Sequence, residues 1–420
     1  MKIKKYILYL VTAFIAFNVN SQTSTEIIPT PNDSRVITTG VPFLLIASDA
    51  RAASMGDMGV ATSVDTYSQF WNPSKYTFSE TKSGFGLSYT PYLSKLVNDI
   101  SLANLTYFNR INERSAFALS LRYFSLGEIE IIPNEQMINN PLITKPNELT
   151  MDISYSLRLA DQFSMGVAVR YLRSDLKLDQ TDADATAASS FAVDISGYFQ
   201  GEEQTFGDVE GRIRGGFSLQ NIGPKIKYDN TEQSETFIPA TLRVGGGFDF
   251  LLDQYNKVAI TAEISKLLVP TPPIYGREYY FTDNNENGVY DEGIDELGDQ
   301  TTGDLVLYSG QTTDVDFLQG IFQSFSDAPG GFSEELKEFT WALGAEYVYD
   351  DSFALRAGYF NESEDKGARK FLALGAGFKF SGTRVDLSYL FSASRVPSPL
   401  ENTLRFSLTF DFGSNSYLEY

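Results

Sequence analysis

Fourteen segments of the chain alternate apolar and polar residues, and this period of two is typical of β-strands that bury one face. From residue 404 to residue 412 every second side chain is Leu or Phe, and Arg, Ser, Thr and Asp lie between them. A half-buried strand of a soluble sandwich alternates in the same way, so the pattern alone does not choose between a sandwich and a barrel. The segments lie at about 84–90, 100–109, 115–125, 148–159, 163–174, 189–200, 211–221, 237–250, 256–265, 338–349, 352–361, 370–380, 383–392 and 403–412.

The links between these segments favour a barrel. Links after even-numbered segments are mostly short, as at Asp350-Asp351, and only the link at 201–210 is longer. Links after odd-numbered segments are generally longer, above all the one at 266–337. Bacterial outer-membrane barrels have this arrangement, with short periplasmic turns, long external loops and an even number of strands. The sequence therefore predicts an all-β fold, a 14-stranded antiparallel transmembrane β-barrel.

The composition agrees with a barrel and excludes several functions. Aromatic residues make up 14% of the 420 residues and glycine occurs 33 times, which is unusual for a soluble domain. The chain has no cysteine and no histidine, which removes disulfides, thiol nucleophiles, serine–histidine triads and His-bearing zinc sites. We therefore expect no enzymatic activity. The formal net charge of −21 argues against nucleic acid as a partner.

Residues 1–21 have the pattern of a secretory signal peptide. Three lysines within the first five residues precede an apolar run from Tyr6 to Phe17. A run of about a dozen residues is too short for a spanning helix, which needs about 20. Removal of this segment, with its three lysines, would lower the net charge from −21 to −24. We expect residues 22–39, which are polar and contain two prolines, to form a flexible arm.

Residues 40–75 do not alternate, and we predict that they fill the lumen as a plug. They begin with an apolar turn, continue through a small-residue helix that carries Asp49 and Arg51, and break at Gly56 and Gly59. Such compact, charged and glycine-broken sequence is unusual for a free tail. The predicted organisation is a signal peptide at 1–21, an arm and luminal plug at 22–82, a barrel at 83–413 with a long extracellular loop at 266–337, and a C-terminal tail at 414–420.

Two features of the polar strand face fit such a plug. Glycine in strands often marks a close approach of other backbone, and ten positions are glycine: Gly84, Gly86, Gly166, Gly216, Gly245, Gly247, Gly344, Gly358, Gly375 and Gly377. Asp49 and Arg51 are two residues apart and so do not face each other on one helix. We expect each to pair with an opposite charge on the lumen wall, while a transport gate is the alternative. The candidates on the wall are Arg158, Arg170, Arg212, Arg214, Arg243, Glu263, Glu346, Arg356, Asp386 and Arg405.

The plug also carries the run D-A-R-A-x-x-M-G-D-x-G-V-A, followed by W-N-P. The residues of this motif are Asp49, Arg51, Met55, Gly56, Asp57, Gly59, Trp71, Asn72 and Pro73. The motif resembles the N-terminal signature of FadL-like outer-membrane barrels and, more closely, that of the PorV family of the type IX secretion system. Trp71 is more often a packing residue than a ligand contact, and we interpret it so.

The resemblance implies a role in protein export. It implies an outer-membrane carrier without catalytic residues that binds the C-terminal signal domains of cargo proteins at the translocon barrel. The carrier then passes cargo to a cell-surface attachment complex that contains a sortase. Outer-membrane lipid would surround the barrel, and both termini would be periplasmic. The alternatives are a FadL-like transporter of hydrophobic small molecules and, less favoured because histidine is missing, a lipid deacylase.

The long loop contains a candidate calcium site. Asp283, Asn285, Asn287 and Asp291 place oxygen ligands at alternate positions, as in the first half of a calcium loop. The twelfth position, where a bidentate Glu is expected, is Ile294, although Glu292 or Asp295 could replace it. The other interpretation is a solvated acidic turn. Apart from Ca²⁺, the sequence suggests no cofactor.

The same loop contains an apolar stripe at helical spacing, formed by Phe317, Leu318, Ile321, Phe322 and Phe325. We favour packing of this helix onto the barrel rim over docking of a partner. Aromatic residues are enriched at protein interfaces, so a docking surface would also include Tyr279, Tyr280 and Phe281.

Overall fold

The computed structural model describes most of the chain and divides it into two compact units. The described residues are 24–29, 34–93, 99–132, 141–176, 187–228, 235–285, 287, 290–297, 305–394 and 403–413. The larger unit, the barrel unit, covers residues 35–271 and everything from 313 on, and the smaller unit covers the chain up to residue 34 and residues 272–312. The predicted signal peptide and C-terminal tail lie outside the described residues.

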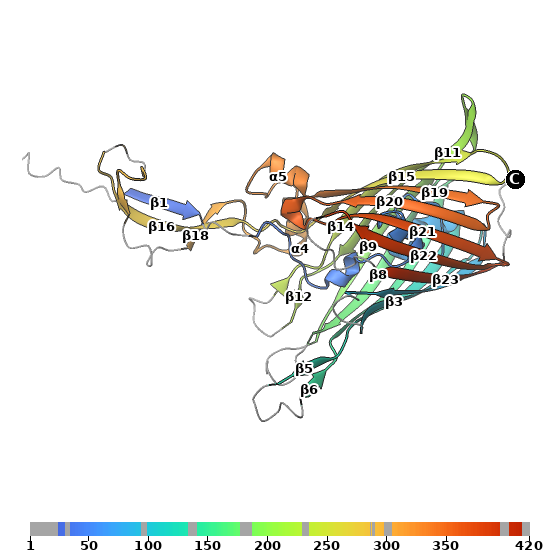
Figure 1. Ribbon diagram of the computed structural model, residues 1–420, viewed down its shortest axis with the longest axis horizontal. Coiled ribbons are helices and arrows are strands. Elements are labelled where there is room, and N and C mark those ends of the chain that lie inside the picture. Colours follow the sequence, from blue (N-terminus) through green and yellow to red (C-terminus); the bar gives the residue numbers. More distant parts are fainter. Residues whose placement is uncertain are drawn as a thin grey trace, which may run out of the picture. The chain divides into compact units, whose positions relative to one another are not determined.

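The barrel unit is built from fourteen antiparallel strands, as the sequence predicts (Figure 1). Each strand pairs with its neighbours in chain order, and the last strand pairs with the first, so the sheet is closed. The strands are β2 (Ser83–Pro91), β3 (Ile100–Arg110), β4 (Ser115–Leu126), β7 (Asn147–Ala160), β8 (Phe163–Asp175), β9 (Ala188–Gln200), β11 (Val209–Ile222), β14 (Thr241–Leu251), β15 (Asn256–Leu267), β19 (Phe339–Tyr349), β20 (Phe353–Asn361), β21 (Lys370–Phe380), β22 (Thr383–Ser392) and β23 (Leu404–Phe412).

Short strands extend three of the links. β5 (Ile129–Ile131) pairs with β6 (Leu142–Thr144), and β12 (Ile226–Lys227) pairs with β13 (Glu235–Thr236), both within links of the long-loop end. At the short-turn end, β10 (Gln204–Phe206) pairs with the start of β11. This hairpin explains why the link at 201–210 is longer than the other turns of its end.

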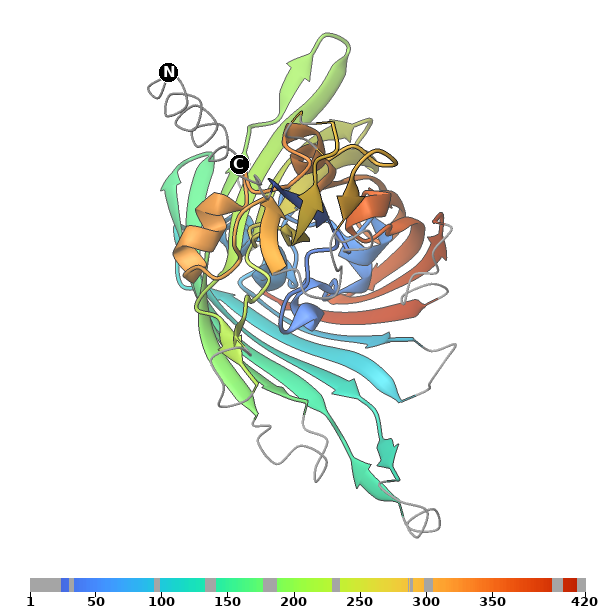
Figure 2. The same cartoon turned by 90° about the vertical axis from the view of Figure 1, so that its left-hand side faces the viewer.

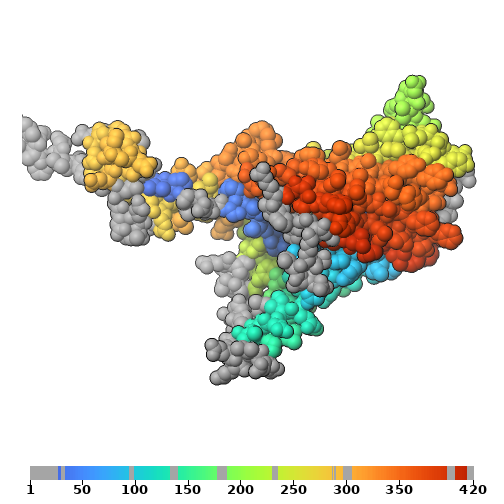
Figure 3. All heavy atoms as spheres, viewed as in Figure 1, coloured from blue at the N-terminus to red at the C-terminus, as the bar shows by residue number. Residues whose placement is uncertain are grey.

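The strands alternate between an outer apolar face and an inner polar face. In β7, Met151, Ile153 and Tyr155 are exposed, whereas Asp152 and Ser154 between them are buried. Figure 3 shows that the side chains of β19 to β23 form a continuous outer surface on one side of the barrel. Apolar side chains outside and polar ones inside are the pattern of an outer-membrane barrel. Within the described part of the chain, no helix has the length and apolar character needed to cross a membrane.

The plug lies inside the ring of strands, where Figure 2 shows it in blue. It contains η1 (Pro42–Leu45), α2 (Ala50–Ser54), α3 (Ser68–Trp71) and η2 (Pro73–Phe78). Phe43 and Leu44 of η1 belong to one apolar cluster with Phe124 and Leu172 of the wall. A second cluster lies within the plug and joins α2 to α3 through Ala52 and Phe70, among others. The plug therefore has a small core of its own and is also packed onto the barrel.

The plug begins at one end of the barrel and finishes at the other. Near its start, the Gly40 amide donates to the Phe237 carbonyl in a link of the long-loop end, at 2.9 Å. At its finish, the Lys82 amide donates to the carbonyl of Gly413, which directly follows the last strand, at 3.2 Å. The two ends of the described barrel unit therefore lie at opposite ends of the barrel. The prediction that both termini of the chain are periplasmic stays a prediction, because residues 1–23 and 414–420 lie outside the described residues.

The smaller unit is a four-stranded antiparallel sheet. Its central strand β16 (Ile274–Thr282) pairs with β1 (Ser24–Pro29) on one side and with β17 (Glu296–Leu297) and β18 (Leu305–Ser309) on the other. Part of the arm predicted to be flexible is therefore a strand. The rest of the long loop belongs to the barrel unit and contains α4 (Phe317–Gln323) and α5 (Phe332–Lys337).

Candidate functional site

The plug touches the wall where the strands carry glycine. A Cβ atom at Gly344 would lie 2.7 Å from the Met55 carbonyl oxygen, and one at Gly358 would overlap the Met55 backbone. Of the ten predicted glycines, eight face plug atoms in this way: Gly84, Gly86, Gly166, Gly216, Gly245, Gly344, Gly358 and Gly375. Gly247 and Gly377 instead face side chains of the wall. The expected close approach of the plug is confirmed at these eight positions.

Arg51 of α2 makes the ion pair with the wall that the sequence predicts. Its guanidinium lies 2.7 Å from the Glu346 carboxylate of β19 and 2.8 Å from that of Asp65 in the plug. Glu346 also pairs with Arg356 of β20 at 2.6 Å, and Arg356 pairs with Asp386 of β22 at 2.7 Å. The side chains of all five residues are at most 9% exposed, so the plug is tied to three strands by one connected and largely buried network of charges.

Asp49 does not make the predicted ion pair. Its carboxylate caps α2 by accepting from the Ala52 amide at 2.8 Å, and it also accepts from Trp71 Nε1 at 2.9 Å and Ser48 Oγ at 3.1 Å. Among the described residues, no lysine or arginine forms an ion pair with it. The prediction was wrong because neutral donors of the plug itself satisfy the buried carboxylate.

The remaining motif residues fix the fold of the plug. Trp71 packs edge-on against Phe70, with ring centres 4.7 Å apart, and lies against Gly59, where a Cβ would overlap the indole. Asn72 Nδ2 donates to the carbonyl oxygens of Val60 at 2.9 Å and Gly197 of β9 at 3.0 Å. Packing, rather than ligand contact, is therefore the role of Trp71.

Two further motif residues meet the wall. Asp57 pairs with Arg405 of β23 at 3.0 Å. Gly56 has a positive φ of 88°, and a Cβ there would lie 2.8 Å from the Tyr359 carbonyl oxygen of β20. Pro73 begins η2, and its carbonyl accepts from Ser156 Oγ of β7 at 2.7 Å.

Sequence reasoning missed two cations that hold the plug. Arg122 of β4 donates to the Ile46 carbonyl at 2.7 Å, and its guanidinium lies 4.4 Å from the ring centre of Phe70. Lys75 of η2 donates to the Gly59 carbonyl at 2.8 Å. Arg122 lies on the polar face of its strand, and this position could have identified it as a wall contact. Lys75 lies just after the Trp-Asn-Pro motif and outside any alternating segment, so no pattern in the sequence indicated its contact.

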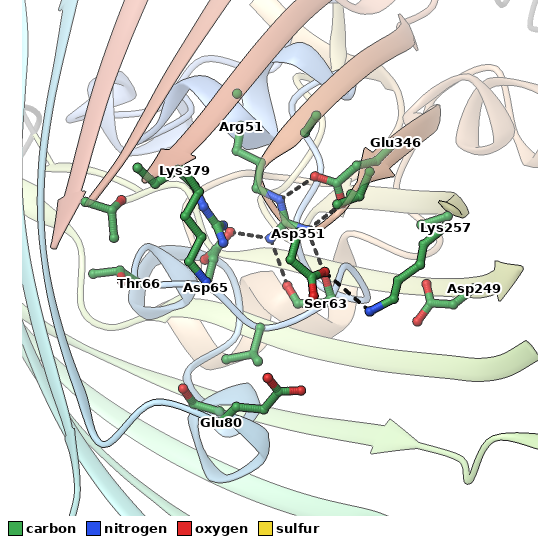
Figure 4. A pocket seen from close by; sticks show the side chains of 18 of the residues that line it. Arg51, Ser63, Asp65, Thr66, Glu80, Asp249, Lys257, Glu346, Asp351 and Lys379 are labelled. Atoms are coloured by element: carbon green, nitrogen blue, oxygen red, sulfur yellow. Dashed lines mark hydrogen bonds and ion pairs between the residues drawn. The ribbon is translucent and has the colours of Figure 1, made fainter. Parts of the chain in front are cut away.

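A polar cavity of about 370 Å³ lies at the short-turn end of the barrel. Figure 4 shows charged side chains of both signs around it, among them Arg51, Asp65 and Glu346. The Lys257–Asp351 pair, whose charged atoms are 3.3 Å apart, also lines the cavity. A pocket for a hydrophobic molecule is lined mainly by apolar and aromatic side chains. This lining is charged, so the cavity is unsuited to such a molecule.

Helices α4 and α5, at the long-loop end, leave apolar side chains in solvent. We define the α4–α5 apolar surface by the exposed residues Leu318, Phe322, Phe325, Phe332 and Leu336. Phe322 is 76% exposed and Phe332 is 78% exposed.

The favoured prediction, that the α4 stripe packs onto the barrel rim, is therefore wrong for Leu318 and Phe322. Phe325 is exposed as well, although its ring centre lies 5.8 Å from Lys266 Nζ of β15. Only Phe317 and Ile321 are half-buried. The side of α4 that packs against the rest of the barrel unit contains Gly320, which is buried because it lies against Phe237 and Pro270.

The predicted aromatic extension of this surface lies in the smaller unit. Tyr279, Tyr280 and Phe281 all belong to β16. Tyr280 is exposed, but Phe281 is buried and packs against Tyr290 with ring centres 5.6 Å apart. Phe281 is therefore not available to a partner.

Electrostatic contacts hold α5 to the barrel unit. Glu334 pairs with Arg35 and with Lys366, both at 2.7 Å. Burial alone would raise the pKa of Glu334, but its bonds to Lys366 and Arg35 outweigh burial and lower the pKa to about 2.

The residues of the candidate calcium turn form hydrogen bonds with one another. Asn285 Nδ2 and Asn287 Nδ2 donate to the Asp291 carboxylate at 2.6 and 2.7 Å, and the Asn287 amide donates to Asp283 Oδ1 at 3.2 Å. Asp295 accepts from the Asp291 amide at 2.7 Å. Part of the turn, namely 286, 288 and 289, lies outside the described residues.

Comparisons with known proteins agree with this geometry. A family model for the type IX secretion system protein PorV matches residues 29–274. A mutant of the monoaromatic hydrocarbon channel TodX is 11% identical, with a TM-score of 0.50, over 87% of this chain and 98% of that chain. The toluene transporter TodX of Pseudomonas putida is 12% identical, with a TM-score of 0.47, over 90% of this chain and 98% of that chain.

A FadL homologue of Pseudomonas aeruginosa is 12% identical over 90% of this chain and 100% of that chain, with a TM-score of 0.45. No curated protein matches the chain significantly. At these identities the first structural likeness shows the FadL-like barrel fold alone.

Proposed function

Because this chain belongs to the PorV family of the type IX secretion system, we propose that it is a non-enzymatic outer-membrane carrier of secreted proteins. It binds the C-terminal signal domains of its cargo at the translocon barrel and passes the cargo to a surface attachment complex that contains a sortase. The absence of histidine and cysteine supports a role without catalysis.

The observation that carries this proposal is the α4–α5 apolar surface. Large apolar side chains gathered on a soluble surface mark contact sites for other proteins, and aromatic residues are enriched in such sites. The lumen, by contrast, is occupied by a plug held through the buried ion pair Arg51–Glu346 and the half-buried ion pair Asp57–Arg405. The proposed carrier therefore binds its partners through its loops and not in the lumen.

A pull-down from native membranes tests the carrier. Wild type should capture secreted proteins that bear the C-terminal signal, together with the translocon. The double variant Phe322→Ser, Phe332→Ser should lose about 2 kcal/mol or more of binding free energy, since aromatic residues dominate interface energetics. The control Phe378→Ser, Phe380→Ser removes two phenylalanines of β21 that are 57% and 73% exposed.

The control should capture as much cargo as wild type. Equal capture by the α4–α5 double variant, with its barrel folded, would count against this docking surface. Failure of wild type to capture any signal-bearing protein would count against the carrier itself.

The alternative is a transporter of hydrophobic small molecules, and the FadL-like fold favours it. The charged cavity beside Arg51 and Glu346 disfavours it. Vesicles that contain only this protein should therefore take up labelled fatty acid no faster than empty vesicles. Faster uptake would support the transporter.

We also propose that the turn formed by Asp283, Asn285, Asn287 and Asp291 binds Ca²⁺. Oxygen ligands at alternate positions, with Asp295 buried beside them, support this. Calorimetry on the purified chain should detect an ion whose binding is weakened by Asp283→Ala. Unchanged binding in that variant would exclude the turn as the site.

A further inference from the structure

Three carboxylates lie close together in the segment that carries the α4–α5 apolar surface. Asp327 lies between the two helices, Glu335 lies in α5 and Glu338 directly precedes β19; all three are buried. Each offers an oxygen that lies within 4.8 Å of those of the other two. This is about twice the 2.3–2.6 Å between Ca²⁺ and an oxygen ligand, so one ion can contact all three oxygens.

Hydrogen bonds hold these carboxylates in place. The Thr271 amide donates to Asp327 Oδ2 at 3.0 Å, and Thr271 Oγ1 donates to Glu338 Oε1 at 2.5 Å. The Ala328 amide donates to Glu335 Oε1 at 2.9 Å. Each contact leaves further lone pairs on the carboxylates. The oxygens are therefore already oriented before any ion arrives.

The cations around the cluster do not neutralise Asp327. Lys266 pairs with Glu335 at 3.3 Å and also with Glu338, and Lys366 pairs with Glu338 at 2.9 Å. Since Glu334 also pairs with Arg35 and Lys366, three cations face four carboxylates. Among the described residues Asp327 has no ion-pair partner.

An orphaned atom of Asp327 is a second, separate observation. The residue is 1% exposed, yet its Oδ1 has no hydrogen-bond partner. A buried polar atom without a partner is costly, and such atoms in native structures call for a ligand, a water or an ion.

We propose that Asp327, Glu335 and Glu338 bind one hard divalent cation of the Ca²⁺ class. The donor set consists of oxygens alone, which Ca²⁺, Mg²⁺ and Mn²⁺ prefer over softer metals. The ion would supply the positive charge that Asp327 lacks and would join the α4–α5 segment to the start of β19. The site stands independently of the carrier function and of the turn at Asp283.

The experiment measures ion binding to the full chain, purified in detergent and stripped with a chelator. The background variant Asp283→Asn, Asp291→Asn removes both carboxylates from the four proposed ligands of the calcium turn. Titration of this variant with Ca²⁺, Mg²⁺ or Mn²⁺ should reveal one bound ion per chain. Adding Asp327→Asn should weaken binding about tenfold or more, since loss of even an outer-shell partner of a ligand typically costs 10–100-fold.

Asp365→Asn is the matched control, because this carboxylate is exposed and pairs with exposed Lys337 at 2.8 Å. It should leave the affinity unchanged. Absence of binding to the background variant up to about 10 mM ion would overturn the site, since weak extracellular calcium modules have a Kd of about 1 mM.

Equal binding with and without Asp327→Asn would place the ion elsewhere and would also overturn the proposal. Should Asp327→Asn fail to fold, as judged by circular dichroism, Glu335→Gln replaces it with the same expected loss and the same overturning result.

Discussion

Gly358 of β20 lies where plug and wall are closest, since a Cβ there would overlap the Met55 carbonyl carbon and lie within 2.5 Å of Met55 Cα. These are backbone atoms, which cannot rotate away. We expect Gly358→Ala to destabilise the plug by about 1–3 kcal/mol, as overpacking does in a tight core. Urea unfolding followed by Trp71 fluorescence, in a Trp341→Phe background, measures this change.

Gly246→Ala serves as the control for this experiment. A Cβ at Gly246 meets only the Arg214 carbonyl oxygen, at an ordinary contact distance of 3.7 Å. We expect its unfolding midpoint to match that of the background. A similar loss in both variants would assign the effect to strand propensity rather than to contact with the plug.

The lowered pKa of Glu334 predicts that the stability of α5 depends on pH. Its pKa of about 2 lies below the ordinary value of 4.5, so the folded chain binds fewer protons than the unfolded chain between these values. The stabilisation from Glu334 is therefore complete above about pH 4.5 and is lost as the pH falls toward 2. Hydrogen exchange of residues 330–338 should be slower in wild type than in Glu334→Gln at pH 5.

This difference should vanish near pH 2. Comparison of the two chains at each pH cancels the intrinsic pH dependence of exchange. A ratio that stays constant between pH 5 and pH 2 would contradict the prediction.

Among individual residues, the sequence predicted those whose role follows from their type and position. Arg51 is a cation in a segment predicted to face a charged wall, so an ion pair with an acidic wall residue was expected, and Glu346 was one of the candidates. The partner of Asp49 was not predictable in this way. Its carboxylate accepts hydrogen bonds from the Ala52 amide at the start of α2 and from the indole of Trp71. Both contacts depend on how the plug folds in three dimensions.

At the level of elements, the strands were predictable because lipid outside and polar side chains inside impose a strict period of two. The face of α4 was not. An apolar stripe indicates that one face of a helix is apolar, but it does not indicate whether that face packs against the barrel or stays exposed. Here the close approach uses Gly320 against Phe237, and the stripe is left largely exposed. Strand β1 was missed because six residues are too few to establish a period.

Strand β1 permits a test of register. It is an edge strand, in which Ile27 pairs with Glu278 and Ile28 with Arg277. In an antiparallel pair, adjacent residues alternate between bonding the partner and facing away. Of the variants Ile27→Pro and Ile28→Pro, only one should therefore remove a bond to β16 and speed hydrogen exchange at residues 276–281. Equal effects of both variants would contradict the pairing.

On the scale of the whole molecule, the plug should act as an electrical seal. Removing one member of a buried ion pair costs about 3 kcal/mol because its partner stays buried and charged. Arg51→Ala removes the ion-pair partner of Asp65 and leaves Glu346 with Arg356 alone, so the conductance of this variant in planar bilayers should exceed that of wild type. Lys257→Ala breaks a pair with Asp351 in which both side chains are largely exposed, and it should conduct like wild type.

The passage of the plug from one end of the barrel to the other also constrains the order of assembly. The plug is made before any strand of the barrel, and the barrel closes only when β23 reaches β2, the pairing with the greatest sequence separation in the ring. Pairings between distant parts of a chain form late. The sheet must therefore wrap around a plug that is already inside. Once β23 has paired with β2, the plug cannot be inserted without reopening the barrel.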